Sequence, residues 1–332
     1  MKKVILLLLL VASMTSVGAQ KSLRGLNIAY NTLENKEKDD YDIYVMQPDG
    51  SGKTNITQNP DVAWTYFAYA DKLYWISDRD TCYRCYYLYE SDAKGQTIRK
   101  VSGLRLEDSW MSARNKGREL IVTGRLNKDV RGQLFVIDVS TGAFRQITQD
   151  TAARYNDPVF SPDGSQIVYR YKKNKRDRDE KAELWISNAD GSAARQLTHY
   201  PAGDTTASWH SYHAGAPHWN AQRNLITYQS KQGGRYRLFA VSPDGKKQFE
   251  WPGLPGNMGA GWHDWSPDGR WLAIELFPDE DQPGDIYLFD AKKKTLKQIT
   301  DGPGYEYSPV WVKQKANRKG QKTKGKMQKF IE

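Results

Sequence analysis

The chain has 332 residues, of which 39% are hydrophobic, 12% aromatic and 27% charged, and its formal net charge is +10. The aromatic content excludes a wholly disordered chain. The charge is concentrated at the two ends of the chain. Residues 313–332 hold eight Lys or Arg against one acidic residue, and Lys2 and Lys3 add two more cations, which leaves about +1 on residues 20–312.

The first 19 residues predict a secretory signal peptide. A charged start precedes an apolar run at 4–12 that is too short to span a bilayer, and small residues at 17–19 suit cleavage. No later apolar run reaches membrane length. The sequence therefore predicts an exported protein without a transmembrane segment, periplasmic or secreted. Nucleic acid is not predicted as a partner, because it is not expected in the compartment of an exported protein.

A repeat with a period of 45 to 54 residues runs through the rest of the chain. Each copy contains a short strand, rich in β-branched and aromatic residues, that leads into a turn. The same apolar position recurs in every copy, at Ile43, Leu88, Leu134, Leu184, Leu238 and Ile286. A period of this length, built from strands and turns, is typical of β-propeller blades. The sequence therefore predicts an all-β, six-bladed propeller.

Turn signals divide each repeat into four strands. Ser-Pro-Asp-Gly at 161–164 and 266–269 separates a first strand from a second, because Pro presets the first turn dihedral and Gly accepts a positive φ. The repeated strand is the third. The fourth ends in a hydrophobic–Thr pair, as at 147–148 and 299–300.

The two ends of the predicted propeller complement each other. The chain opens with a second strand at 26–30 and closes with a first strand at 307–311. We therefore expect the last blade to be assembled from both termini, which removes open sheet edges. The propeller is predicted over 20–312. The basic tail, 313–332, has no periodicity, so we expect it to be disordered and to contact anionic surfaces.

These repeats resemble those of the TolB-type propeller family. The resemblance rests on the Ser-Pro-Asp-Gly turns, on strands such as 43–46, and on the closing Arg-Gln-Ile/Leu-Thr of 145–148 and 195–198. It implies a stand-alone, exported, non-enzymatic propeller that binds a protein or peptide of the cell envelope at its channel mouth. The repeats are more distantly similar to those of oligogalacturonate lyases. A hydrolase-linked propeller is excluded, because Gly-x-Ser-x-Gly is missing.

Strand direction predicts that the histidines gather at one end of the ring. His210 and His213 lie in a long connection between blades, and His218 and His263 begin first strands. One interpretation is a Zn or Mn site near the channel mouth. The alternative function is then a metal-dependent oligosaccharide lyase, as the resemblance to oligogalacturonate lyases implies. The other interpretation is that these histidines bond to the backbone or stack on aromatic rings, with no cofactor.

Aromatic residues near the same end predict a binding face of the kind that anchors a partner or a sugar. They are Tyr66, Trp110, Trp209, Tyr212 and Trp262. Asp108, Asp157 and Asp264 occupy related first-strand positions. Two of them across the channel would suit glycosidase chemistry, whereas aspartates at such positions otherwise cap the turns between blades.

The only two cysteines, Cys82 and Cys85, are three residues apart. In an exported protein this spacing favours a small disulfide over a metal site. A redox role is disfavoured, because the pair lies between two predicted strands and not at a helix N-terminus that would lower a thiol pKa.

Overall fold

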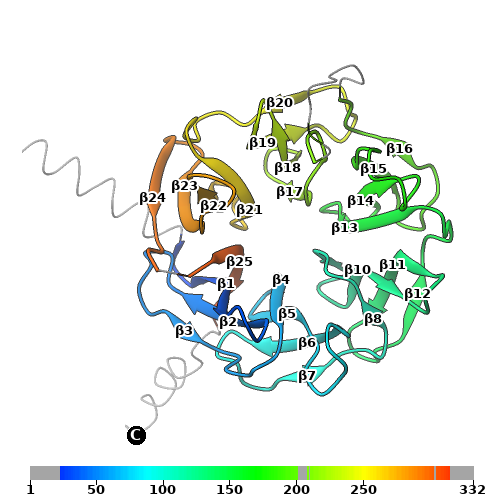
Figure 1. Cartoon of the computed structure of the whole chain (residues 1–332), viewed down its shortest axis with the longest axis horizontal. Coiled ribbons are helices and arrows are strands. Elements are labelled where there is room, and N and C mark those ends of the chain that lie inside the picture. The colour runs from blue at the N-terminus through cyan, green and yellow to red at the C-terminus, as the bar shows by residue number, and fades with distance from the viewer. Residues whose placement is uncertain (1–22, 201–207, 209, 303, 315–332) are drawn as a thin grey trace, which may run out of the picture.

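The structure, a computed structural model, describes residues 23–200, 208, 210–302 and 304–314. Within these ranges, antiparallel strands form six sheets arranged in a ring (Figure 1). The predicted six-bladed, all-β propeller is confirmed. The predicted signal peptide and the tail from residue 315 onward lie outside the described residues. The described part contains no helix long and apolar enough to cross a membrane.

Five blades are built from consecutive strands. Blade 2 contains β4 (Ala63–Tyr69), β5 (Lys72–Ser77), β6 (Tyr87–Asp92) and β7 (Arg99–Lys100). Blade 3 contains β8 (Arg105–Leu106), β9 (Ser112–Arg114), β10 (Glu119–Arg125), β11 (Arg131–Asp138) and β12 (Phe144–Gln146). Blade 4 contains β13 (Arg154–Phe160), β14 (Gln166–Lys172), β15 (Glu183–Asn188) and β16 (Arg195–Gln196). Blade 5 contains β17 (His218–Asn220), β18 (Leu225–Gln232), β19 (Arg235–Val241) and β20 (Gln248–Glu250). Blade 6 contains β21 (Gly259–Trp265), β22 (Trp271–Phe277), β23 (Asp285–Asp290) and β24 (Thr295–Gln298).

Blade 1 joins the two ends of the chain. Its strands are, from the channel outward, β25 (Glu306–Lys313), β1 (Leu26–Asn35), β2 (Asp40–Met46) and β3 (Thr54–Asn55). β1 and β25 pair antiparallel, with Leu26 opposite Lys313. The predicted closure by both termini is confirmed. The predicted boundary at 312 falls within β25, which ends at Lys313, and the Gln314 N–H donates to the Gly25 carbonyl at 2.8 Å.

The hydrophobic–Thr pairs have a structural role. In each case the Thr Oγ1 accepts the main-chain N–H of the first apolar residue in the third strand, at 2.8 to 2.9 Å. The pairs are Thr57 with Ile43, Thr148 with Leu134, Thr198 with Leu184, and Thr300 with Ile286. The repeated Thr therefore ties the end of the fourth strand to the start of the third.

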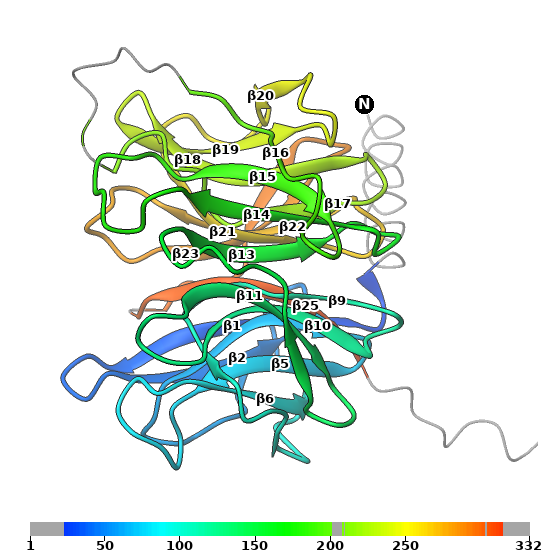
Figure 2. The same ribbon diagram turned by 90° about the vertical axis from the view of Figure 1, so that its right-hand side faces the viewer.

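Each blade presents two kinds of connection at opposite ends of the ring. Turns joining first to second and third to fourth strands form one end, here called the turn end. Loops joining second to third strands, and one blade to the next, form the loop end. In Figure 2 the strands of blade 4 run across the page between these ends. At the turn end, Gly164 and Gly269 take positive φ angles of 75° and 63°, as the Ser-Pro-Asp-Gly turns require.

The apolar core lies between neighbouring blades. Where blade 1 meets blade 6, for example, Tyr30 and Met46 pack in one buried cluster with Trp271 and Ile286. Because each sheet buries both faces on its neighbours, the interfaces between blades stabilise the ring. The side chains that line the central channel lie outside most of these interfaces.

Candidate functional site

Irregular first strands bring particular side chains to the centre of the ring. The ladder between first and second strand shifts register in four blades, and in blade 3 the first strand is split into β8 and β9. The shifts fall at Tyr66, Asp157–Pro158, Gly261–Trp262 and Ser308–Pro309. A bulge re-aims its side chain, and this is how aromatic residues reach the channel.

Two indoles meet across the channel. Trp110 belongs to blade 3 and Trp262 to blade 6, the opposite blade of the ring, yet their ring centroids are 6.1 Å apart. Tyr66 and His218 also contact Trp110, at 5.4 and 4.4 Å between centroids, and His263 lies 4.5 Å from His218. These rings divide the channel into a turn-end part and a loop-end part.

The turn-end part is a cavity of about 300 Å³. Every blade contributes an apolar side chain to its lining: Phe67, Met111, Val159, Trp219, Trp265 and Trp311. Turn residues such as Pro162 and Pro267 form its rim, and Tyr66, Trp110 and His218 form its floor. A concave site lined by all six blades is suited to enclosing an inserted group.

Three ring nitrogens in this turn-end cavity are buried and lack a hydrogen-bond partner among the described residues. They are Trp110 Nε1, Trp219 Nε1 and His218 Nε2. The other ring nitrogen of His218, Nδ1, lies 3.8 Å from Asp264 Oδ1. Buried polar atoms are nearly always hydrogen-bonded. These three nitrogens are therefore suited to hydrogen bonds with polar groups of a ligand bound in the cavity.

The loop end carries a cleft between blades 4, 5 and 6. It consists of two adjoining hollows of about 370 and 240 Å³ that share Arg170, His210, His213 and Tyr236. Glu275 lines the deeper hollow. Burial raises the pKa of Glu275 to about 7, against the opposing effect of a hydrogen bond from the Trp262 N–H. This carboxyl can therefore hold a proton near neutral pH.

The predicted binding residues are divided between these two sites. Tyr66 and Trp110 are not exposed at the loop end but are buried at the floor of the turn-end cavity, with 6% and 5% of their surface accessible. Trp262 lines the loop-end cleft. Tyr212 is half-buried and its N–H donates to the Lys231 carbonyl. The remaining predicted residue, Trp209, lies outside the described part of the chain.

The four predicted metal-ligating histidines form two pairs. His210 and His213 line the loop-end cleft, whereas the rings of His218 and His263 contact each other in the channel, tilted by 51°. Among residues 23–200, 208, 210–302 and 304–314, no group of three or more His, Cys, Asp or Glu is placed to hold a metal ion. Burial, and then the neighbouring His218, lower the pKa of His263 well below its usual range, and its Nε2 bonds to the Thr227 hydroxyl at 2.8 Å.

The three aspartates near the channel are each engaged with a neighbouring blade. Asp157 accepts the Trp110 N–H at 2.9 Å, and Asp264 accepts the Trp311 N–H at 2.9 Å. Asp108 accepts the Tyr66 hydroxyl at 2.5 Å. The first two tie a first strand to the next, so these carboxylates act as links between blades.

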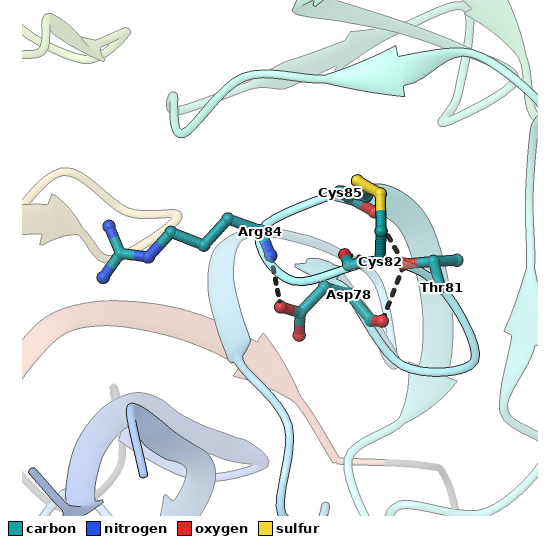
Figure 3. Close-up of a disulfide and its surroundings, with 5 residues drawn as sticks. All are labelled: Asp78, Thr81, Cys82, Arg84 and Cys85. Carbon is teal, nitrogen blue, oxygen red and sulfur yellow. Dashed lines mark hydrogen bonds between the residues drawn. A yellow bond between two sulfur atoms is a disulfide. The ribbon is translucent and has the colours of Figure 1, made fainter. Parts of the chain in front are cut away.

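Cys82 and Cys85 form a disulfide in the loop between β5 and β6, at the loop end (Figure 3). The loop is further fixed by Asp78, whose carboxylate accepts the Arg84 N–H at 2.7 Å. The Thr81 hydroxyl donates to the Cys85 carbonyl at 2.9 Å. Arg84 in turn pairs with Asp39 of blade 1.

Sequence reasoning missed the residues that surround the histidines in the loop-end cleft. Arg154, Arg170, Gln229 and Glu275 lie in ordinary-looking strands and carry no motif. The one signal in the sequence is that these polar residues occupy the loop-end halves of first and second strands, where apolar residues would otherwise be expected.

Comparisons with known proteins agree on the fold. No family model matches the chain. Over 114 residues it is 32% identical to the Tol-Pal system protein TolB of Anaeromyxobacter dehalogenans strain 2CP-C, which covers 34% of this chain and 24% of that protein. The crystal structure of TolB from Acinetobacter baumannii superposes with a TM-score of 0.67 at 15% identity, over 88% of this chain and 68% of that one. This chain is a TolB-like β-propeller.

The other similar proteins, and the short length of the match to TolB, limit which properties can be assigned to this chain. An oligogalacturonate lyase in complex with manganese superposes with a TM-score of 0.52 at 15% identity, over 78% of this chain and 70% of that one, which is a likeness of fold alone. The match to TolB spans about a quarter of the curated relatives' length. The activities and partners of those whole proteins therefore do not transfer with the fold.

Proposed function

We propose that this TolB-like propeller is an exported, non-enzymatic binding protein that captures a protein or peptide segment of the cell envelope at its channel mouth. The turn-end cavity carries the proposal, so the proposed site lies at the opposite end of the ring from the binding face predicted from the sequence. An apolar side chain inserted there would be desolvated by walls from six blades, and its neighbouring main-chain groups would bond to Trp219 Nε1 and His218 Nε2.

Export to the periplasm is part of the proposal. It is supported by the predicted signal peptide at 1–19, by the Cys82–Cys85 disulfide, and by sequence similarity to TolB. Fractionation of cells expressing the full chain tests it: the processed protein is expected in the periplasmic fraction. Recovery of the unprocessed chain in the cytosol would contradict it.

Partner capture is tested by crosslinking and affinity purification from envelope extract. The informative variants are Trp219→Phe, which removes one unpartnered N–H and keeps an apolar ring, and His218→Ala. Phe249→Ala is a matched control, because Phe249 is exposed on the outer strand β20. We expect both cavity variants to lose the captured partner while the control retains it. Equal capture by all of them would refute the proposed site.

A second candidate function is a metal-dependent oligosaccharide lyase that uses the loop-end cleft. His210, His213 and Gln229 line one hollow there, and imidazole nitrogens are ligands that Zn and Mn accept. It ranks second because the described residues offer no group of three His, Cys, Asp or Glu suited to a metal. Metal analysis of the full protein decides: about one Zn or Mn per chain, lost in His213→Ala, would favour the lyase.

A further inference from the structure

Cationic side chains outnumber acids at the loop end of blades 3 and 4. The cations are Arg105, Arg125, Arg131, Arg154, Arg170 and Lys172, and the buried acids among them are Glu107 and Asp157. Glu107 is shared by Arg125 and Arg131, at 2.6 and 3.3 Å. These two buried acids balance only part of the charge of the six cations. Further acids, Asp129, Asp150, Asp177, Asp179 and Glu180, lie in the loops at the same end, together with further Lys and Arg residues.

The pairing of β13 and β14 concentrates charge within the cleft. Arg154 lies directly opposite Lys172, and Arg170 lies opposite Asn156, two residues along on the same face. Like charges directly opposite each other destabilise a sheet unless an anion lies between them. Each of these four residues lines the same hollow.

The arginine side chains are incompletely satisfied by the described residues. Arg154 Nε donates to the neutral Asn156 side chain at 2.6 Å. Arg170 Nη1 pairs with Asp157 at 2.8 Å, but Arg170 Nε is buried and has no hydrogen-bond partner in the described part of the chain. Burial, followed by the charge of Arg170, lowers the pKa of Arg154. An anion placed here would satisfy Arg170 Nε and offset the repulsion.

The adjoining hollow has a different character. Gln229 Oε1 is a buried acceptor without a partner among the described residues, and it lines the wall together with Trp262 and Phe277. Tyr236 lines both hollows. The cleft thus runs from a cationic end to an end with aromatic walls, the Gln229 acceptor and the Glu275 carboxyl, which can hold a proton near neutral pH. This sequence of features matches a polypeptide, which carries side-chain carboxylates, main-chain N–H donors and apolar side chains in a row.

We propose that this arginine cleft (Arg154, Arg170, Lys172, Gln229 and Tyr236) binds an acidic polypeptide segment. A carboxylate lies between Arg154 and Arg170, where planar guanidinium groups bind it through paired hydrogen bonds. A main-chain N–H donates to Gln229, and an apolar side chain packs on Tyr236. A singly charged carboxylate suits the site better than phosphate, because Asp157 already pairs with Arg170 and would repel a second charge. This site lies on the other side of the Trp110–Trp262 contact from the turn-end cavity, so it adds to the function proposed above.

The test uses the full chain and a set of blocked peptides with fluorescent labels. Each peptide carries one Glu and one Phe, separated by zero to four Gly, and each has a twin with Gln in place of Glu. Binding is measured by anisotropy at low ionic strength for the wild type, Arg154→Gln and Lys172→Gln. Arg118→Gln is the matched control, since Arg118 has a side chain 70% exposed and lies at the turn end of blade 3.

We expect at least one Glu peptide to bind more tightly than its Gln twin by about tenfold or more, as for a hydrogen bond to a charged group. Arg154→Gln and Lys172→Gln should remove that difference, and Arg118→Gln should keep it. The proposal fails if Glu and Gln twins bind alike, or if no peptide binds at millimolar concentration. It also fails if inorganic phosphate or a uronic-acid oligosaccharide binds the cleft in place of the peptides.

Discussion

The indole of Trp110 and the indole of Trp262 lie 6.1 Å apart, although their blades stand on opposite sides of the ring. Trp110 reaches this position from the gap between β8 and β9, and Trp262 from the bulge in β21. The contact spans the channel between opposite blades. A cavity among the turns lies on one side of it and a cleft among the loops on the other, so the two ends of one propeller present different side chains.

We predict that Trp110→Ala destabilises the protein by about 3–5 kcal/mol, because it removes a buried indole and enlarges the cavity beside it. Trp262→Ala should cost less, since Trp262 is only half-buried. Urea unfolding followed by circular dichroism measures both. Trp110→Phe, which keeps a ring against Tyr66 and His218, is expected to recover part of the loss. Equal stabilities for Trp110→Ala and the wild type would show that the contact is incidental.

The link between Asp157 and the neighbouring blade is expected to matter for folding. Asp157→Ala removes the acceptor of the Trp110 N–H and leaves Arg170 without its carboxylate. We expect a loss of about 2–3 kcal/mol, measured from the urea midpoint. Asp163→Ala changes an aspartate in an exposed turn and should cost less. A similar small cost for both variants would contradict the role assigned to Asp157.

The closing blade predicts where the chain can be shortened. Ending the chain after Gln314 should leave the melting temperature within a few degrees, because surface changes rarely exceed about 0.5 kcal/mol. Ending it after Val312 removes the hydrogen bonds from Lys313 to Ala70 and from Gln314 to Gly25, and should be measurably worse. Deleting residues 23–31 removes most of β1 and should abolish cooperative unfolding. A cooperative transition in that last variant, by calorimetry, would refute closure through β1.

Because the structure places Cys82 and Cys85 in a disulfide, we predict that thiol reagents find no free cysteine in the folded protein. Replacing Cys82 and Cys85 together by Ser should cost about 2 kcal/mol, since the bridge closes a loop of only a few residues in the unfolded chain. Thiol labelling and urea unfolding measure the two effects. Two reactive thiols in the native protein, purified without reductant, would contradict the first expectation.

The raised pKa of Glu183 leads us to predict that the free energy of unfolding depends on pH. Burial raises its pKa from 4.5 to about 8, despite hydrogen bonds from Thr198 and Tyr200. The folded state therefore keeps a proton that the unfolded state releases, and this group's contribution to stability falls as the pH rises from about 4.5 to 8. Glu183→Gln should remove that fall, so its stability relative to the wild type should increase across this window. Parallel pH profiles for the two proteins would show that Glu183 is not responsible.

Fold and site were not equally predictable from the sequence. The number of blades and their closure follow from the repeat period and from the strand types found at the two ends of the chain. Local turn residues mark the strand boundaries, such as Gly164 and Gly269, which take the positive φ angles that their turns require. The path of the first strands does not follow, because a bulge depends on packing at the channel. A single extra residue in β4 moves Tyr66 from the loop end to the cavity floor. Loop-end alignment of Arg154 with Lys172 likewise depends on pairing register, and no local motif marks it.

The pairing of Leu26 with Lys313 has a mechanical consequence. Both ends of the described ring leave from the same end of the β1–β25 ladder. Force applied between the two termini would therefore open that ladder one hydrogen bond at a time, as a zipper, instead of loading all its bonds together in shear. A tether that pulls on both termini would open blade 1 first, at low force. The same load applied between two other blades would have to separate complete sheets from each other and would need a higher force.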